Sequence, residues 1–197
     1  MTPDAAASAT VEAFPLIVIR LRTWRILCHE LRRRGGGIRE SGAFLLGAAP
    51  GDGPTRPPTV TQVAYYDDLD AHCLTGGISL AGAAYDRLWR RCEQDRLAVV
   101  ADIHTHPRAG VDQSRIDATN PMMALPGHLA LILGHYAAGP SDPASVGTHV
   151  YRGAHTWQRI PPDERDQAIR LVGIDPFGLR TGLARRAPRR HPQENHR

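Results

Sequence analysis

Two histidines and one aspartate within a span of fourteen residues have the types and spacing needed to bind a metal ion. His104 and His106 alternate along a run that we expect to form a strand, so their side chains point to one face. Pro107 ends this strand, which predicts that the pair lies at the edge of the sheet, where a cleft can open. Asp117 would return to the same place from a short helix beyond the loop. Two imidazoles and one carboxylate leave a fourth position for water, as in a catalytic zinc site.

The three cysteines do not belong to this pattern. Cys28, Cys73 and Cys92 are odd in number, and none of them lies near the histidines in sequence. A structural zinc site would use four protein ligands, usually thiolates, and the sequence does not favour one. The spacing also gives no disulfide framework, so we expect a cytoplasmic protein of bacterial type.

Hydrophobic periodicity predicts the elements that would position these residues. A strand at 16–21 leads into a helix with Thr23 as its N-cap and the glycines 35–37 as its end. The buried positions of this helix, spaced i, i+3, i+4 and i+7, are Trp24, Leu27, Cys28 and Leu31. A strand that carries Glu40 near its start is expected at 38–48, and further strands are expected at 59–66, 72–75, 97–104, 128–134, 146–152 and 156–160.

Three further helices complete the predicted domain. One begins at Ser79, a short one is expected at 114–123, and an amphipathic one at 163–171. The buried stripe of the first is expected to be Tyr85, Leu88, Trp89 and Cys92. This order of elements predicts a single α/β domain, an α-β sandwich with a central mixed sheet flanked by helices.

The length of 197 residues suits one domain with short ends. We expect a flexible leader at 1–13, the folded domain at 14–175 and a disordered tail rich in arginine and proline at 176–197. No apolar run approaches the ~20 residues that cross a bilayer, so no membrane association is expected. The formal net charge of +4 comes mainly from the tail, and a solvated end is favoured over nucleic-acid binding.

The residues downstream of the histidines make the pattern distinctive. Seven residues separate His106 from Ser114, and two more separate Ser114 from Asp117. Together with His104, this spacing resembles the JAMM signature of the JAB/MPN family of zinc metallopeptidases at each defining position. The upstream run 40–47 (ESGAFLLG) is similar to the acidic strand of that family, in which an acid is followed by glycine and apolar residues. The resemblance covers most of the chain.

The resemblance implies a JAB/MPN-like, cytidine-deaminase-like sandwich that binds one zinc ion per chain through His104, His106 and Asp117. It implies that Glu40 takes a proton from water at the zinc and later passes it to the leaving amine. Ser114 is implied as a hydrogen-bond donor to the oxyanion, a contact worth about 3 kcal/mol in comparable sites. Asp102 could orient a ligand from behind or be a plain polar residue at a strand end, and the sequence favours neither.

The family also implies a substrate class, namely peptide or isopeptide bonds after the Gly-type C-terminal tail of a ubiquitin-like protein. The run 102–133 is similar to the prokaryotic JAB branch, whose members lie beside E1-like and E2-like enzymes in bacterial ubiquitin-like conjugation operons, including antiphage ones. The segment 67–78 lies where relatives carry a clamp for the tail, and a plain surface loop is equally expected. One alternative is a peptidase that releases an amino acid from a sulfur-carrier protein.

Other functions fit the sequence less well. Non-catalytic MPN interaction scaffolds have lost their metal ligands, whereas this chain has all of them. A zinc nucleobase deaminase would need the motifs His/Cys-x-Glu and Pro-Cys-x-x-Cys, which are missing. Five further histidines are expected on the surface or as hydrogen-bonded core residues, namely His29, His128, His135, His149 and His155. Trp24 and Trp89 are expected in the core and not as stacking surfaces.

Overall fold

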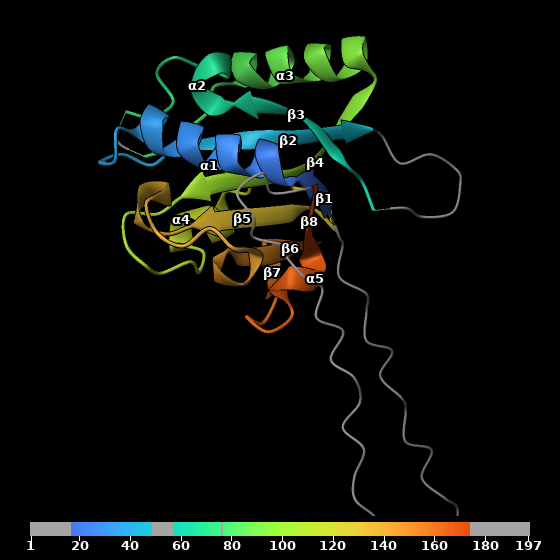
Figure 1. Ribbon diagram of the computed structural model, residues 1–197. Helices are drawn as coiled ribbons and strands as arrows, with labels where there is room; N and C mark the ends of the chain where they lie inside the picture. The colour runs from blue at the N-terminus through green and yellow to red at the C-terminus, as the bar shows by residue number, and fades with distance from the viewer. Residues whose placement is uncertain (1–16, 49–56, 76, 174–197) are drawn as a thin grey trace, which may run out of the picture.

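The computed structural model describes residues 17–48, 57–75 and 77–173. Its central sheet (Figure 1) has six strands, β2 (Gly42–Ala48), β3 (Val60–Tyr65), β4 (Leu97–Thr105), β5 (Leu129–Leu133), β6 (Gly147–Gly153) and β7 (Thr156–Arg159). The strand order is β3-β2-β4-β5-β6-β7. β4 and β5 are parallel and all other neighbours are antiparallel. The sheet is therefore mixed, as predicted.

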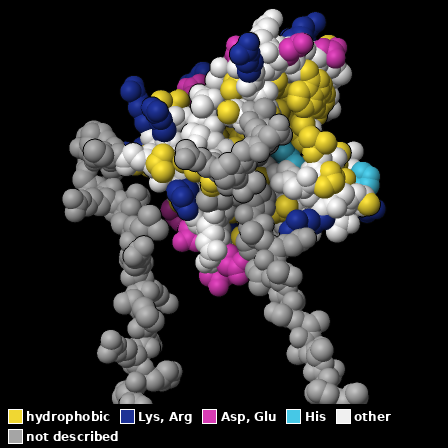
Figure 2. Space-filling view, turned by 90° about the vertical axis from the view of Figure 1, so that its right-hand side faces the viewer, with side chains coloured by type: hydrophobic (Ala, Val, Ile, Leu, Met, Phe, Trp, Pro, Cys, Tyr) yellow, Lys and Arg dark blue, Asp and Glu magenta, His cyan; other side chains and the backbone are white. Residues whose placement is uncertain are grey.

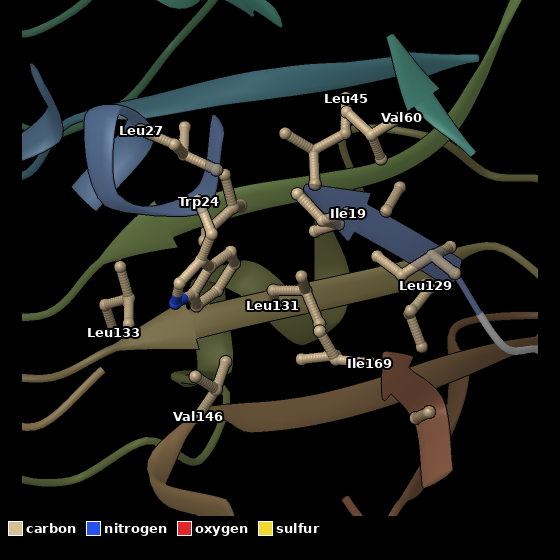
Figure 3. Packing of buried hydrophobic residues seen from close by; sticks show 14 of the residues in the cluster. Ile19, Trp24, Leu27, Leu45, Val60, Leu129, Leu131, Leu133, Val146 and Ile169 are labelled. Carbon is tan, nitrogen blue, oxygen red and sulfur yellow. The ribbon is translucent and has the colours of Figure 1, made fainter. Parts of the chain in front are cut away.

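One face of the sheet is covered by helix α1 (Leu21–Gly35), which lies along it in Figure 1. A small parallel pair of strands, β1 (Ile17–Arg20) and β8 (Ile169–Val172), covers the rest of this face with the single turn α5 (Arg165–Ala168). Figure 3 shows the core that they enclose, which includes Ile19, Trp24, Leu27, Leu45, Leu129, Leu131 and Ile169. Each such fully buried large side chain contributes about 1.5–3 kcal/mol to folding.

The opposite face packs against α3 (Gly82–Asp95), and the short helices α2 (Tyr66–Leu69) and α4 (Arg115–Thr119) lie on the same side. Side chains alternate along a strand, so Phe44 and Leu46 of β2 point to this side, while their neighbours point to α1. The result is a three-layer α/β arrangement around the mixed sheet. Two 3₁₀ turns, His135–Ala137 and Pro143–Ser145, join the later strands.

Two predicted helix starts are wrong. α1 begins at Leu21 directly after β1, so Thr23 lies inside the helix and does not cap it. α3 begins at Gly82, three residues after Ser79. Neither helix has a side-chain cap at its N-terminus. Packing of the apolar faces therefore sets these starts, and the nearest capping residue type does not.

The last predicted helix is also largely wrong. Helical structure within 163–171 is limited to the one turn of α5, and from Ile169 the chain forms β8, which pairs with β1. The partner strand lies at the other end of the chain, beyond the reach of any local pattern. The segment 72–75, predicted as extended, forms turns.

Trp89 is 44% exposed, so its predicted place in the core is wrong, whereas Trp24 is buried as predicted. The buried stripe of α3 consists of Ala84, Leu88 and Cys92 at spacing i, i+4 and i+8. A residue directly after Leu88 is rotated by about 100° from this stripe. Only one side of α3 packs on the sheet, so Trp89 faces outward.

The predicted leader at 1–13 and the predicted tail at 176–197 lie outside the described residues. Within the described ranges, no helix has both the length and the apolar character that crossing a membrane requires.

Candidate metal centre

The first two predicted metal ligands lie at the carboxyl end of β4. His104 is the penultimate residue of the strand, and His106 follows it directly. Ile103 packs into the core beneath α1, so the alternate position, His104, faces the other side of the sheet. β4 lies between β2 and β5. The expected position at a sheet edge is therefore wrong, and the site opens at the end of an interior strand.

Three ligand atoms converge at this point. His104 Nε2 lies 3.1 Å from His106 Nε2, and Asp117 Oδ2 lies 3.8 Å from the first and 3.3 Å from the second. Zinc bonded at about 2.0–2.1 Å in a tetrahedron separates its ligand atoms by about 3.3 Å. The three atoms thus form a triangle close in size to one face of that tetrahedron, and their chemistry suits zinc. Within the described residues they form a cluster able to hold a metal ion.

The orientation of His106 is set by its second ring nitrogen. His106 Nδ1 lies 3.2 Å from the carbonyl oxygen of Gly110. A carbonyl can only accept, so Nδ1 donates to it, and Nε2 faces the site, where it can bind a metal ion once it carries no proton. This support by a backbone carbonyl is common behind metal-binding histidines.

A left-handed turn supports the loop that follows His106. The residues of the turn, His135–Ala137, have φ values of 54°, 52° and 61°. The first two N–H groups of the turn donate to the carbonyls of Arg108 (3.0 Å) and His106 (2.8 Å). Left-handed backbone costs about 1–2 kcal/mol per residue, so surrounding contacts must hold it in place. The sequence analysis missed this support, because no residue type in the turn indicates a left-handed backbone.

Asp117 reaches the histidines from α4, whose first turn is closed by a capping box. Ser114 Oγ accepts a hydrogen bond from the backbone N–H of Asp117 (3.2 Å), and Asp117 Oδ2 accepts one from the N–H of Ser114 (2.7 Å). This reciprocal pair fixes the carboxylate relative to the helix. The sequence interpretation gave Ser114 an oxyanion role and missed the cap, although the Ser-x-x-Asp spacing was a signal for it. α4 is also shorter than the predicted helix at 114–123.

The electrostatics keep Asp117 ionised. Burial by itself raises the pKa of Asp117, but hydrogen bonds from His104, His106 and Ser114 hold that pKa far below its usual value. Burial lowers the pKa of His106, but the hydrogen bond and charge of Asp117, followed by the charge of Glu40, raise it overall above its ordinary value. The carboxylate is therefore already in the form that binds a metal.

Glu40 lies just before β2, which begins at Gly42, and not within a strand as predicted. Its neighbour Ser41 ties this segment to the end of β4. The N–H of Ser41 donates to Thr105 Oγ1 (3.0 Å), and its hydroxyl donates to the carbonyl of Leu31 (2.7 Å). Ser41 is buried and was missed as a supporting residue. A polar residue directly beside a predicted acid was the available signal.

A cavity of about 500 Å³ opens beside the ligands, and Glu40, His104, Ser114 and Asp117 all line it. Its other walls come from the loop before α3, from α3 itself, from α4 and from β7. His106 does not line the cavity, but it contacts His104, which does. The structure thus brings all five predicted site residues together beside one cavity.

The side chain of Asp102 contacts His128 and Tyr66 and not the predicted metal ligands. Its Oδ1 lies 2.6 Å from His128 Nε2, and its Oδ2 accepts a hydrogen bond from the Tyr66 hydroxyl (3.4 Å). Both members of the Asp102–His128 pair are buried, and Asp102 lines the cavity. The contacts match neither interpretation left open by the sequence, because Asp102 lies within β4 and forms a buried pair with His128 beneath the site.

The other histidines agree with expectation. His128 and His149 are buried and hydrogen-bonded, the latter to the carbonyl of Val111 (3.1 Å). His29, His135 and His155 are exposed. On the face shown in Figure 2, arginine side chains stand apart with acidic side chains among them. On that face the described residues form no continuous basic area of the kind that nucleic-acid-binding proteins present.

The chain matches no family model. Among solved structures it is similar to protein DSY2949 from Desulfitobacterium hafniense, with a TM-score of 0.54 and 15% identity over 83% of this chain and 97% of that one. A protein from Salinibacter ruber aligns with a TM-score of 0.48 and 16% identity over 90% of this chain and 99% of that one. At this level of identity the first likeness shows a shared fold alone, so any inference about chemistry rests on the residues of the site.

Proposed function

We propose that this chain is a zinc-dependent peptidase or isopeptidase of the JAB/MPN type. The observation that carries the proposal is the triangle of His104 Nε2, His106 Nε2 and Asp117 Oδ2, whose sides of 3.1–3.8 Å fit one zinc ion. A carboxylate outside this triangle, Glu40, lines the same cavity. Three protein ligands and a separate acid are the parts of a catalytic zinc site, whereas a structural site is closed by four ligands.

Each residue has a distinct part in the proposed hydrolysis. Zinc bound by the three ligands would supply a Lewis acid that polarises the substrate carbonyl and lowers the pKa of water to about 7. Glu40 accepts a proton as water attacks the carbonyl carbon, and it returns the proton to the nitrogen of the breaking C–N bond. The Ser114 hydroxyl hydrogen is not used in the capping box, where its oxygen accepts, so it can donate to the developing oxyanion.

The cavity supports a narrow, extended substrate. Its walls leave room for a peptide segment, and glycine just before the scissile bond lets a backbone approach the metal at least steric cost. In the described part of the chain, no arginine lines the cavity. A free α-carboxylate on the leaving side would therefore meet no arginine among the described residues that line the cavity. This favours an isopeptide or internal peptide bond over the release of a single amino acid from a sulfur carrier.

We propose as substrate the Gly-ending tail of a ubiquitin-like protein, with deconjugation or precursor processing in a bacterial, cytoplasmic pathway of antiphage defence. E1-like and E2-like enzymes encoded nearby would be its pathway partners. A metal-free scaffold is disfavoured because the ligand set is complete and correctly spaced.

The test is cleavage of fusions in which a reporter follows the tail of a ubiquitin-like protein encoded beside this chain. Zinc-loaded wild-type protein should cut directly after the terminal glycine, as read by intact mass. It should largely spare a fusion with bulky residues before the cut, and it should cleave the isolated tail peptide poorly. Glu40→Ala is the blank. Equal cleavage of casein, tail peptide and fusion would identify a general protease and would reject the deconjugase proposal.

A further inference from the structure

We propose that Trp157, on β7, is a positioning residue for the metal site, because its indole N–H holds the helix that carries Asp117. The inference rests on the zinc site of the proposed function but not on peptidase activity. A metal-binding measurement can therefore test it separately.

Helix α4 needs support from outside. It is five residues long, and none of its residues is buried. A helix of this length has little stability of its own. The capping box of Ser114 and Asp117 fixes the carboxylate relative to α4, but it does not fix α4 relative to the sheet.

Trp157 connects α4 to the sheet. Its Nε1–H donates to the carbonyl oxygen of Ala118 at 3.1 Å. Apart from the contacts of Asp117 with the histidines, this is the one hydrogen bond between α4 and another element in the described part of the chain. The indole ring packs edge-on against Tyr151, with centroids 4.9 Å apart and an angle of 64° between the rings. The ring is therefore fixed on β7, and its hydrogen bond fixes α4 relative to this strand.

The same hairpin supports the loop before α4. His149 of β6 contacts the carbonyl of Val111 at 3.1 Å, and Arg159 of β7 pairs with Asp112 at 2.7 Å. Gly147 of β6 lies so close that an added Cβ would be 1.9 Å from Val111 O. The β6–β7 hairpin thus carries the whole segment from Val111 to α4. Trp157 is the contact on this hairpin nearest to the metal ligand.

The consequence concerns metal affinity more than folding. Without the indole donor, α4 can shift on the hairpin, and Asp117 Oδ2 leaves its place in the ligand triangle. Loss of a group that orients a metal ligand typically weakens binding about 10–100-fold.

The experiment compares Trp157→Phe with Trp24→Phe in the full chain. Phenylalanine keeps an aromatic ring at position 157 and removes only the donor. Trp24 is a matched control, since its Nε1–H also donates to a backbone carbonyl, that of Ser141 at 2.7 Å, but in the core on the α1 side. Zinc affinity is measured by competition with a chromophoric chelator, and the melting temperature of each zinc-free form is measured in parallel.

We expect Trp157→Phe to bind zinc at least tenfold more weakly than wild type. We expect Trp24→Phe to stay within about twofold of wild type while it loses at least as much thermal stability. Unchanged zinc affinity in Trp157→Phe would overturn the proposal, and so would an equal loss in Trp24→Phe. Failure of Trp157→Phe to fold would assign the indole to folding and reject a positioning role. If wild-type protein bound no zinc, the metal site itself would be wrong.

Discussion

At the scale of single residues, substitution of Glu40 and substitution of a metal ligand should have different effects. Both residues line one site, but in the proposed function only the ligands contact the metal. Glu40→Gln keeps the size of the side chain and removes its basicity. We expect unchanged zinc content and melting temperature, with turnover reduced about 10²–10⁴-fold, the usual contribution of a general base. Metal analysis measures the zinc content, thermal melting gives the melting temperature, and the fusion assay measures the turnover. Glu30 pairs with Arg33 and Arg34 on α1 and does not line the cavity. Glu30→Gln should therefore leave zinc content and turnover unchanged. Wild-type turnover in Glu40→Gln would remove Glu40 from the mechanism.

Ser114 has two possible contributions, and two substitutions distinguish them. Ser→Ala at an N-cap costs about 1 kcal/mol, whereas Ser→Gly costs only a few tenths. If the hydroxyl donates to the oxyanion, both variants should lose turnover about equally, by roughly 10²–10³-fold. Their zinc affinities and melting temperatures should differ, with Ser114→Gly closer to wild type. Near-normal turnover in Ser114→Gly would mean that Ser114 acts only as a cap.

At the scale of elements, close packing requires glycine at two positions of β2. A Cβ on Gly42 would lie 2.2 Å from the fully buried Tyr66 ring and 2.8 Å from the carbonyl oxygen of Ile103. A Cβ on Gly47 would lie 2.5 Å from the carbonyl oxygen of Thr59. The glycines of the run 40–47 therefore allow β2 to pack closely beside the site.

We expect Gly42→Ala to lower the free energy of unfolding by about 1–3 kcal/mol or more, the cost of overpacking a core that cannot yield. Urea denaturation measures the loss. Gly82→Ala is the control, since no atom lies within 4 Å of an added Cβ at that helix start. It should be neutral or slightly stabilising. Equal behaviour of the two variants would contradict the packing argument.

Local patterns predicted the elements whose partners are near in sequence or whose apolar face is regular. β4, β5 and the β6–β7 hairpin follow the predictions closely, and so does the buried face of α1, although not its start. The patterns failed where a distant partner decides, as for β8, which pairs with β1. They also failed where only one side of a helix is covered, as for Trp89.

The candidate site was predictable because its residues are chemically unusual and regularly spaced. His104, His106 and Asp117 converge as their types and spacing suggested. The supports behind them were not predictable, because they depend on backbone carbonyls and on elements far away in sequence. Gly110 orients His106, and Trp157 holds α4 from a strand that begins 39 residues after Asp117. The resemblance to a peptidase family stays a prediction that biochemical tests must decide.

At the scale of the whole molecule, zinc should stabilise the fold without being required for it. The two hydrophobic clusters lie on either side of the sheet, and neither includes a metal ligand. A ligand that binds only the native state at 100 times its Kd adds about 2.7 kcal/mol. For a chain of this size that corresponds to a rise in melting temperature of about 5–10 °C. We expect EDTA to lower the Tm by this amount while the far-UV circular dichroism stays native.

His104→Ala is the control for this measurement, and its Tm should not respond to zinc or to EDTA. A wild-type protein whose Tm ignores zinc would show that no ion binds tightly to the native state. Complete unfolding in EDTA would instead show that the ion is structural, as in small zinc-dependent domains.

The central claim is that His104, His106 and Asp117 bind one zinc ion, and metal content measures it most directly. Purified wild-type protein, His104→Ala, Asp117→Ala and the exposed control His155→Ala are compared by elemental mass spectrometry after extensive dialysis. We predict about one zinc per chain in wild type and His155→Ala, and nearly none in the two ligand variants, because two remaining ligands hold zinc weakly. Full zinc content in His104→Ala and Asp117→Ala, or none in wild type, would contradict the account.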